Sequence, residues 1–354
     1  MTKMVKMSED RSGECGCRIC GNQLGNRSHQ AREMFSGTRD MFTYIECAAC
    51  GTLQLKDVPD LRSYYAADYY SFQPAIDSGA VAHGFKKRLS YQAGEYIRRR
   101  VAAYYCGRRA VCGEYRHLLG RSLSKRMGRV IVGFPEYLKV TRLDLHLTPR
   151  SSILDVGSGA GLTLLALSHF GFNDLTGVDP FLEDSITYSA GVRALKAELS
   201  DLNRRFDLIL ANHSIEHVPD PRATLKEIHR LLKPKHYAII RLPIVSRAWR
   251  QYGTNWVQLD PPRHLYLFTE KTLTTLTEEA GFTVREVTYD STAFQFWGSE
   301  QYARDIPLVD ARSYFVNPDK SLFTNKQLVD FAAQAATLNE SREGDQAAFY
   351  LRKE

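Results

Sequence analysis

The chain lacks a long apolar segment. Within its 354 residues there is no uncharged apolar run of the roughly 18 residues that a membrane-spanning helix needs. Residues 1–10 mix lysine, polar and acidic side chains without an apolar core, so no secretory signal is expected. Internal repeats and low-complexity tracts are also lacking. With 44% hydrophobic and 25% charged residues, the composition predicts a globular, cytoplasmic protein with no membrane span.

Cysteine is scarce beyond the first fifty residues. The total of seven is odd, which argues against a disulfide framework in a chain without a signal. Two C-x-x-C-G motifs stand 26 residues apart, and their thiols are Cys17, Cys20, Cys47 and Cys50. Thiolates at i and i+3 of a tight turn can share one tetrahedral Zn²⁺. The spacing predicts a closed, structural zinc site in a small zinc-ribbon-like module over residues 11–58, with Cys15 and His29 as substitute ligands.

Positive charge is concentrated in one segment. The net charge is +7, yet residues 86–150 alone carry 16 lysines and arginines against four acidic residues. Such a segment attracts an anionic partner, which can be nucleic acid, a diphosphate-bearing substrate or a lipid surface. The alternative is a solvated helical face. Residues 59–145, which begin with an aromatic cluster around Tyr65 and Tyr69, are predicted to be a helical linker region.

From residue 151 short apolar runs alternate with helical stretches, which is typical of βαβ units on a parallel sheet. The pattern predicts a Rossmann-like, doubly wound α/β domain over residues 146–354. It includes an insertion at about 291–345 with one helix over 325–335. The predicted strands are 152–156, 174–178, 206–211, 237–242, 282–288 and 347–352, and the predicted helices are 162–169, 221–232 and 269–280.

Polar and glycine residues follow the strands of this predicted sheet. Gly157, Gly159 and Gly161 come directly after the first strand, where a tight turn lets the backbone approach a ligand. A dinucleotide fingerprint would need glycine at 162, where Leu162 stands, so a dehydrogenase is disfavoured. Asp179 ends the second strand, and an acid there can accept hydrogen bonds from both hydroxyls of a ribose. Asp155 lies near the end of the first strand, and Pro180 follows Asp179. Glu198 and Leu199 precede the strand over 206–211, and Asn212 comes directly after it.

This ordered series over residues 151–242 resembles the class I S-adenosylmethionine-dependent methyltransferases. The resemblance implies that Asp155 and the three glycines bracket the methionine part of S-adenosylmethionine, and that Asp179 holds its ribose next to Pro180. Glu198 and Leu199 would border the adenine, and Asn212 would approach the ligand from the fourth strand. It also implies a seven-stranded sheet that ends in an antiparallel strand.

A narrower resemblance concerns the acceptor. Residues 256–268 look like a methyltransferase subgroup that includes enzymes of ubiquinone and surface-sugar biosynthesis. A zinc module ahead of such a domain resembles the deoxysugar C-methyltransferases, and also the ribosomal-RNA guanine methyltransferases. The first group uses a Glu-His pair at the position of Glu216 and His217, which implies a proton-accepting role for His217. His264 is the second candidate, and Tyr65 and Tyr69 are possible hydroxyl donors.

Three functions follow from the sequence. The first is methyl transfer from S-adenosylmethionine to carbon or oxygen of a small anionic acceptor, such as a nucleotide-linked sugar or a surface-polysaccharide precursor. The second is RNA methylation guided by the zinc module and the basic segment. The third is a zinc-dependent binding protein whose methyltransferase domain no longer catalyses. The Glu216-His217 pair can also be a structural helix start, with the turn set by the residues that follow it.

Overall fold

The computed structural model describes residues 16–65, 72, 135–138, 143 and 145–354. The predictions made for Cys15, for Tyr69 and for most of the helical region and basic segment between residues 66 and 144 lie outside the described residues.

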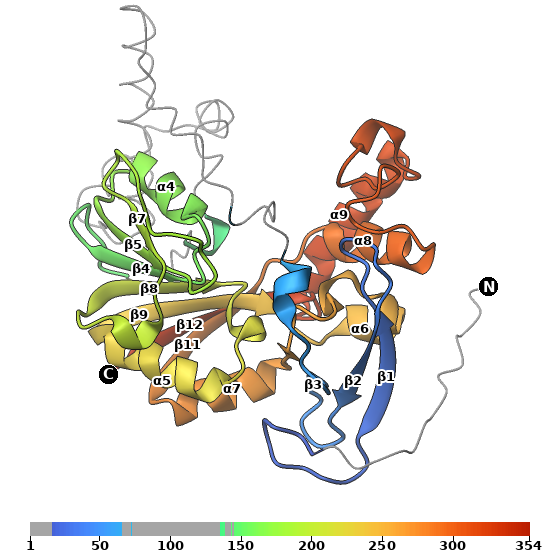
Figure 1. Ribbon diagram of the computed structural model, residues 1–354, viewed down its shortest axis with the longest axis horizontal. Coiled ribbons are helices and arrows are strands. Elements are labelled where there is room, and N and C mark those ends of the chain that lie inside the picture. The colour runs from blue at the N-terminus through green and yellow to red at the C-terminus, as the bar shows by residue number, and fades with distance from the viewer. Residues whose placement is uncertain (1–15, 66–71, 73–134, 139–142, 144) are drawn as a thin grey trace, which may run out of the picture.

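A mixed β-sheet forms the centre of the fold (Figure 1). Its order is β11-β12-β9-β8-β4-β5-β7-β6, with parallel pairing from β7 through β9 and antiparallel pairing of β12 with both β9 and β11. In chain order the strands are β4 (Ser152–Val156), β5 (Asp174–Val178), β6 (Ile186–Thr187), β7 (Arg193–Leu195), β8 (Phe206–Asn212), β9 (Leu232–Pro243), β11 (Phe282–Tyr289) and β12 (Gln346–Lys353).

This order confirms the predicted doubly wound, Rossmann-like α/β fold with an antiparallel strand near one edge. The predicted number of seven strands is wrong by one, because the two-residue β6 pairs with the outer edge of β7. A strand this short carries no alternation that a sequence pattern can show. The strand predicted over 237–242 is present but begins earlier, at Leu232.

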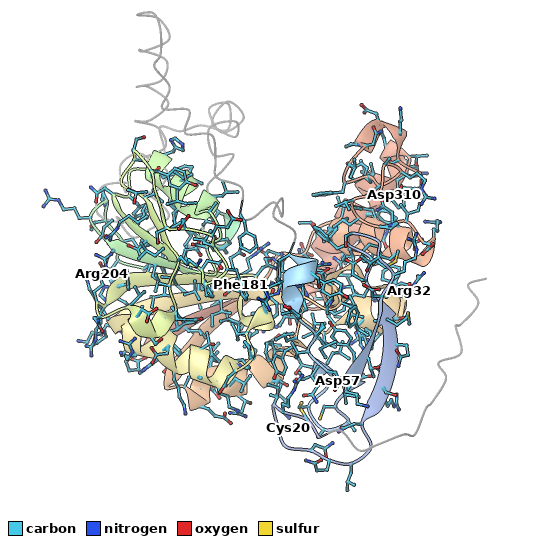
Figure 2. The ribbon with its side chains drawn as sticks, in the orientation of Figure 1. Cys20, Arg32, Asp57, Phe181, Arg204 and Asp310 are labelled. Carbon is cyan, nitrogen blue, oxygen red and sulfur yellow. The ribbon has the colours of Figure 1, made fainter. Side chains whose placement is uncertain are left out.

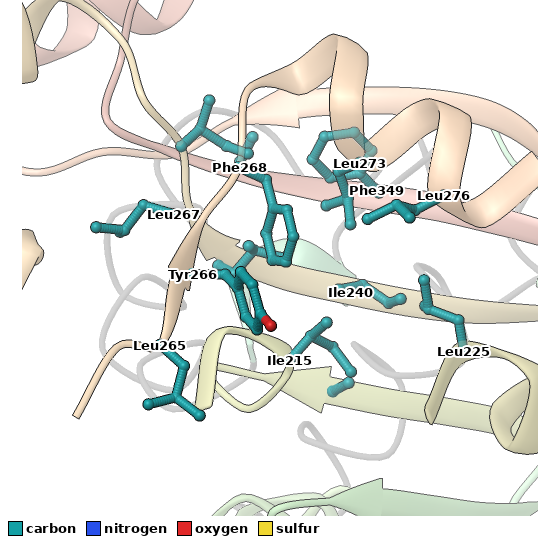
Figure 3. Packing of buried hydrophobic residues seen from close by; sticks show 14 of the residues in the cluster. Ile215, Leu225, Ile240, Leu265, Tyr266, Leu267, Phe268, Leu273, Leu276 and Phe349 are labelled. Atoms are coloured by element: carbon teal, nitrogen blue, oxygen red, sulfur yellow. The ribbon is translucent and has the colours of Figure 1, made fainter. Parts of the chain in front are cut away.

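Helices cover the two faces of the sheet. α5 (Pro221–Leu231) and α7 (Glu270–Glu279) lie on one face and α4 (Leu162–His169) lies on the other (Figure 1). The alternation of β9 explains the two layers, since Ile240 packs with the α5 and α7 side and Ile239 with the α4 side. Figure 3 shows the first of these cores, in which Leu225 and Leu276 lie near Ile240.

Local sequence explains where these helices begin. Asp220 caps α5 by accepting a hydrogen bond from the Ala223 amide at 3.0 Å, and Pro221 takes the first helical position, where a missing N–H costs nothing. Thr269 caps α7 in the same way through the Thr272 amide.

The N-terminal residues form a second, smaller sheet. It contains β1 (Arg27–Arg32), β2 (Met41–Glu46) and β3 (Leu53–Leu55), all antiparallel. Its fourth strand, β10 (Tyr266–Leu267), comes from the second half of the chain and pairs with β3. One strand of the small sheet is therefore supplied by the part of the chain that forms the large domain, which the sequence did not predict.

The insertion packs against this N-terminal sheet (Figure 1). It holds α8 (Phe294–Ala303) as well as α9 (Asn325–Glu340), so the prediction of a single helix is wrong. α8 buries residues on all of its sides, which leaves no apolar stripe of helical period to recognise. The contact with the N-terminal sheet includes hydrogen bonds from Leu308 and Val309 amides to the carbonyls of Met34 and Phe35.

The remaining described helices are short. They are α6 (Arg247–Tyr252) and the 3-10 helices η1 (Leu61–Tyr64), η2 (Glu136–Leu138), η3 (Leu199–Asp201), η4 (Ile215–His217), η5 (Gly253–Asn255), η6 (Val257–Leu259) and η7 (Pro318–Lys320). Among the described residues, no helix has the length and apolar character needed to cross a membrane.

Candidate functional site

The glycine turn lies at the carboxyl end of β4, the first strand of the large sheet. Gly157, Gly159 and Gly161 all have positive φ, at 68°, 50° and 83°. A Cβ atom on Gly157 would stand 2.6 Å from the Cβ of Ser214, so backbone freedom and close approach both require glycine there. β8 lies on one side of β4 and β5 on the other, so the turn sits where the strand order reverses.

Asp179 fastens this turn to the end of β5. One carboxylate oxygen accepts a hydrogen bond from the Gly159 amide at 2.9 Å, and the other accepts one from the Phe181 amide at 2.9 Å. Burial of the carboxyl raises its pKa, and the two amide hydrogen bonds oppose that shift. The acid predicted to hold a ribose therefore also shapes the loop that would bind the rest of the ligand.

Asp155 lies one residue before the end of β4 and is almost fully buried. Burial, together with the negative charge of Asp179, raises the pKa of Asp155 to about 7. A carboxyl in this state is ready to ionise when a cation binds beside it. This suits the predicted place of the methionine part, which carries an ammonium and a sulfonium charge.

The other predicted ligand-binding residues lie at the same edge of the sheet. Pro180 is exposed beside Asp179. Glu198 and Leu199 follow β7, and the backbone amide of Glu198, which caps η3, donates to the side chain of Asp201 at the end of that helix. Asn212 ends β8, and its side-chain oxygen accepts a hydrogen bond from Arg241 at 3.0 Å. The edge thus brings together side chains from β4, β5, β7 and β8.

His217 and His264 form the second half of the site. Their rings are in contact, with centroids 4.8 Å apart. Each Nδ1 atom lies 2.8 Å from a backbone carbonyl oxygen, that of Arg263 for His217 and that of Gln258 for His264. A carbonyl oxygen only accepts, so each Nδ1 carries the hydrogen and each Nε2 keeps a lone pair. Burial lowers the pKa of His264 to about 4, so the His264 Nε2 lone pair stays free at neutral pH.

Glu216 lies between these histidines and His213 and is fully buried. His213 Nδ1 is 3.3 Å and His264 Nε2 is 3.9 Å from Glu216 Oε1. Burial alone would raise the pKa of Glu216, but the neighbouring histidines outweigh it and lower the pKa to about 2. Among the described residues no well-aligned hydrogen bond reaches either carboxylate oxygen.

Tyr65 connects the two halves of the site. Its hydroxyl lies 3.1 Å from His217 Nδ1, and its ring stacks on that of Phe181 with centroids 5.8 Å apart. The Phe181 amide in turn donates to Asp179. Figure 2 shows Phe181 facing the segment of η1 that ends just before Tyr65. The glycine turn and the histidine pair thus belong to one continuous region.

The N-terminal sheet holds the histidine pair in position. The Tyr44 hydroxyl donates a hydrogen bond to the His264 carbonyl oxygen at 2.7 Å. Glu33 and Arg263, both fully buried, form an ion pair of 3.1 Å, and Glu33 also accepts hydrogen bonds from four backbone amides between Phe35 and Thr38. Because the Arg263 carbonyl fixes the tautomer of His217, this buried pair supports the geometry of that ring.

The four predicted zinc ligands meet at the other end of the N-terminal sheet. Their sulfur atoms all lie within 4.8 Å of one another, with 3.8 Å between Cys17 and Cys50 and 3.5 Å between Cys20 and Cys47. The amides of Cys20 and Cys50 each point at the sulfur three residues earlier, at 3.5 Å, as in a metal-binding turn. The donor set fits one tetrahedral Zn²⁺. His29 is no substitute ligand, since its Nε2 pairs with Glu46 at 2.8 Å.

Several of the supporting residues were not found from the sequence. Glu33 and Tyr44 gave no signal, because their partners are more than two hundred positions away. Arg241 could have been noticed as a charged residue at the end of an apolar strand. It contacts Asp290 at 2.6 Å and His213 Nε2 at 3.1 Å, and since arginine only donates, His213 turns its Nδ1 hydrogen towards Glu216.

Comparison with known proteins agrees with this fold. Residues 121–287 match the model of a family described as a methyltransferase domain. A ubiquinone biosynthesis O-methyltransferase of Bradyrhizobium diazoefficiens is 32% identical over 112 residues, which cover 28% of this chain and 42% of that protein. The enzyme of the same name from Psychrobacter arcticus is 27% identical over 172 residues, covering 41% of this chain and 65% of that protein.

The match with these relatives is partial, since it spans less than half the length of the Bradyrhizobium protein. Among solved structures, a cyclopropane synthase of Mycobacterium tuberculosis is similar with a TM-score of 0.39 and 17% identity, over 59% of this chain and 80% of that one. A likeness this distant does not bear on the chemistry of the site.

Proposed function

We propose that this protein, which contains a class I S-adenosylmethionine-dependent methyltransferase domain, transfers a methyl group to a small anionic acceptor. The observation that carries the proposal is the continuous path from Asp179 through Phe181 and Tyr65 to His217. It joins the residues suited to the methyl donor with two histidines, His217 half-buried and His264 buried, whose Nε2 atoms keep a lone pair. A donor pocket beside a proton acceptor is what methyl transfer to oxygen or carbon needs.

The proposed donor pocket uses the residues at the carboxyl edge of the sheet. Asp179 would accept hydrogen bonds from the ribose, next to Pro180, and the glycine turn with Asp155 would hold the methionine part. Glu198 and Leu199 would border the adenine, and Asn212 would face the ligand from β8. S-adenosylmethionine supplies an electrophilic methyl group on a sulfonium.

In the proposed reaction the protein aligns the acceptor and removes its proton. A bond forms between the acceptor atom and the methyl carbon as the carbon–sulfur bond breaks, and the acceptor's proton passes to His217 Nε2. Glu216 stabilises the resulting imidazolium by its negative charge. His264, whose Nε2 is also free, is the second candidate for the same role, and the Tyr65 hydroxyl, 3.1 Å from His217 Nδ1, would help to orient the His217 ring.

The proposed acceptor is a nucleotide-linked sugar or a related surface-polysaccharide precursor. The basic segment of residues 86–150 supports an anionic acceptor. The names of the relatives favour a second candidate within the same reaction class, an oxygen acceptor among quinone precursors. RNA methylation is the alternative that the basic segment would also serve.

We also propose that Cys17, Cys20, Cys47 and Cys50 hold a structural Zn²⁺. Four thiolates close the coordination sphere, so the ion would stabilise the N-terminal sheet and take no part in the reaction. Thiolates need a reducing compartment, which agrees with a cytoplasmic protein.

Transfer of labelled methyl groups tests the function. Purified, zinc-loaded protein is incubated with labelled S-adenosylmethionine and with nucleotide sugars, polysaccharide fragments, quinone precursors or total RNA in parallel. Label in a small acceptor, lost in His217→Ala but not in the half-buried control His236→Gln, which lies away from the site at the start of β9, is the expected result. Label in RNA alone would contradict the proposed acceptor. Folded protein that fails to bind S-adenosylmethionine in calorimetry would indicate a domain that has lost catalysis.

A further inference from the structure

A cluster of Glu216 and His264, both buried, and the half-buried His217 offers three ligand atoms that lie within 4.8 Å of one another. We infer that this cluster is a second metal site, which binds one divalent transition-metal cation through two imidazoles and one carboxylate. The inference shares its residues with the proposed function and rests on that function only for what the cation would do. It concerns a different ion from the one held by the cysteines.

The two histidines are prepared as ligands. A metal-bound imidazole nearly always donates its other ring N–H to a carbonyl or carboxylate, which fixes the ring and its tautomer. Both Nδ1 atoms here make that contact, each 2.8 Å from a backbone carbonyl oxygen, so both Nε2 lone pairs remain available. Two independent backbone carbonyls, those of Arg263 and Gln258, thus produce the same tautomer in adjacent rings.

The carboxylate of Glu216 is the third ligand of the proposed metal site. Glu216 is fully buried, and no well-aligned hydrogen bond from the described residues reaches Oε1 or Oε2. The nearest described donor is His213 Nδ1, so the carboxylate keeps acceptor capacity that a cation can use. His213 Nδ1 at 3.3 Å from Oε1 would then support the ligand from behind, and Arg241 holds His213 in the required tautomer.

The spacing suits one ion after a small adjustment. Ligand atoms around tetrahedral zinc stand about 3.3 Å apart, so the present separations of up to 4.8 Å would need to shorten by up to about 1.5 Å. His264 Nε2 and Glu216 Oε1, which are 3.9 Å apart, need to approach by only about 0.6 Å. Two imidazoles and one carboxylate select Zn²⁺, Fe²⁺ or Co²⁺ and not Ca²⁺, which prefers six to eight oxygens.

Three protein ligands leave coordination positions open, unlike the four cysteines. An acceptor hydroxyl bound in an open position would have its pKa lowered by the cation, and its proton would pass to water. A cation and a proton compete for the same Nε2 lone pairs. Coordination would therefore activate the acceptor in place of direct proton removal by His217.

Cobalt binding tests the site without relying on activity. Protein carrying one zinc per chain in the cysteine cluster is titrated with Co²⁺ at pH 7.5 and followed by absorption and metal analysis. The expected result is one equivalent of Co²⁺ with weak visible bands and no thiolate-to-cobalt charge-transfer band. Glu216→Gln and His264→Gln should each weaken this uptake at least about tenfold, while His236→Gln should leave it unchanged.

Retained zinc and unchanged S-adenosylmethionine affinity would show that the variants are folded. No cobalt uptake beyond the cysteine cluster, or uptake that both variants keep, would overturn the inference. Methyl transfer by protein that takes up no second metal would overturn it too and leave the proposed function standing. Uptake by a protein that transfers no methyl group would leave the metal site standing and count against the proposed function.

Discussion

The Tyr44 hydroxyl donates a hydrogen bond to the backbone carbonyl oxygen of His264, 220 positions later in the chain, at 2.7 Å. Both residues are buried. His264 lies two residues before β10, the strand that pairs with β3. The amide of the next residue, Leu265, donates a hydrogen bond to the backbone carbonyl of Glu216. The small N-terminal sheet is therefore part of the scaffold that positions the histidine pair.

Replacing Tyr44 with phenylalanine should reduce turnover more than donor binding. The variant leaves the buried His264 carbonyl without its donor, which should lower the free energy of unfolding by about 1–3 kcal/mol. We expect a lower kcat with an unchanged dissociation constant for S-adenosylmethionine. Tyr64→Phe is the matched control, because among the described residues the Tyr64 hydroxyl donates to the Asp40 carboxylate and not to the histidine pair. Equal effects of the two substitutions would disprove the positioning role.

Removal of zinc should loosen the N-terminal sheet and reduce activity. The Cys50 carbonyl accepts hydrogen bonds from the hydroxyls of Thr269 and Thr272 at the start of α7, so the cluster is tied to the large domain. A chelator should lower Tm and open residues 16–55 to protease. Cys20→Ser should act in the same way, and Cys112→Ser, outside the two motifs, should not. Metal-free protein that resists protease as well as the zinc form would argue against a structural ion.

Asp179→Ala should weaken binding of S-adenosylmethionine. The substitution removes the proposed ribose acceptor and releases the amides of Gly159 and Phe181. We expect the dissociation constant to rise at least about tenfold, equivalent to about 1.4 kcal/mol, while the fold remains intact. Asp184→Ala, an exposed acid five residues away, serves as the control. Calorimetry that gives the same affinity for both variants would remove Asp179 from the donor pocket.

Two glycine substitutions separate backbone strain from close contact. Gly157 and Gly191 both have positive φ, at 68° and 79°, but only a Cβ at 157 meets another atom, at 2.6 Å. Gly191→Ala should therefore cost about 1–2 kcal/mol of stability, with donor affinity unchanged. Gly157→Ala should cost more and should also weaken S-adenosylmethionine binding. Denaturant unfolding and calorimetry on both variants measure the difference, and identical results would contradict it.

Asp155 should make the ligand-free protein less stable as the pH rises from about 4 to 7. Burial and the charge of Asp179 raise its folded pKa from 3.8 to about 7, so the folded state holds a proton that the unfolded chain releases. That contribution is fully present below pH 3.8 and is lost as the pH passes through 7. Asp155→Asn should flatten this part of the stability curve by at most about 1.4 kcal/mol per pH unit. An unchanged slope in the variant would show that Asp155 ionises normally.

Local patterns in the sequence are sufficient to predict the large sheet and the residues that gather at its carboxyl edge. Alternating apolar runs and helix caps are local signals, and Gly157, Asp179 and Asn212 stand at strand ends that a parallel sheet must bring to one edge. The cysteine motifs are equally local, and their four sulfur atoms do come together. For these features, neighbouring residues in the chain carry the necessary information.

The way in which the small sheet joins the large domain depends on contacts between distant parts of the chain. β10 is two residues long, and its pairing with β3 depends on packing across more than two hundred positions. The same is true of Glu33 with Arg263 and of Tyr44 with His264, which no periodicity or spacing can reveal. The free lone pairs of His217 and His264 also follow from folding, because the backbone carbonyls that fix their tautomers belong to Arg263, in the loop before β10, and to Gln258 in η6. Local signals specify strands and turns, whereas the electrostatics of the site depend on distant groups that burial brings together.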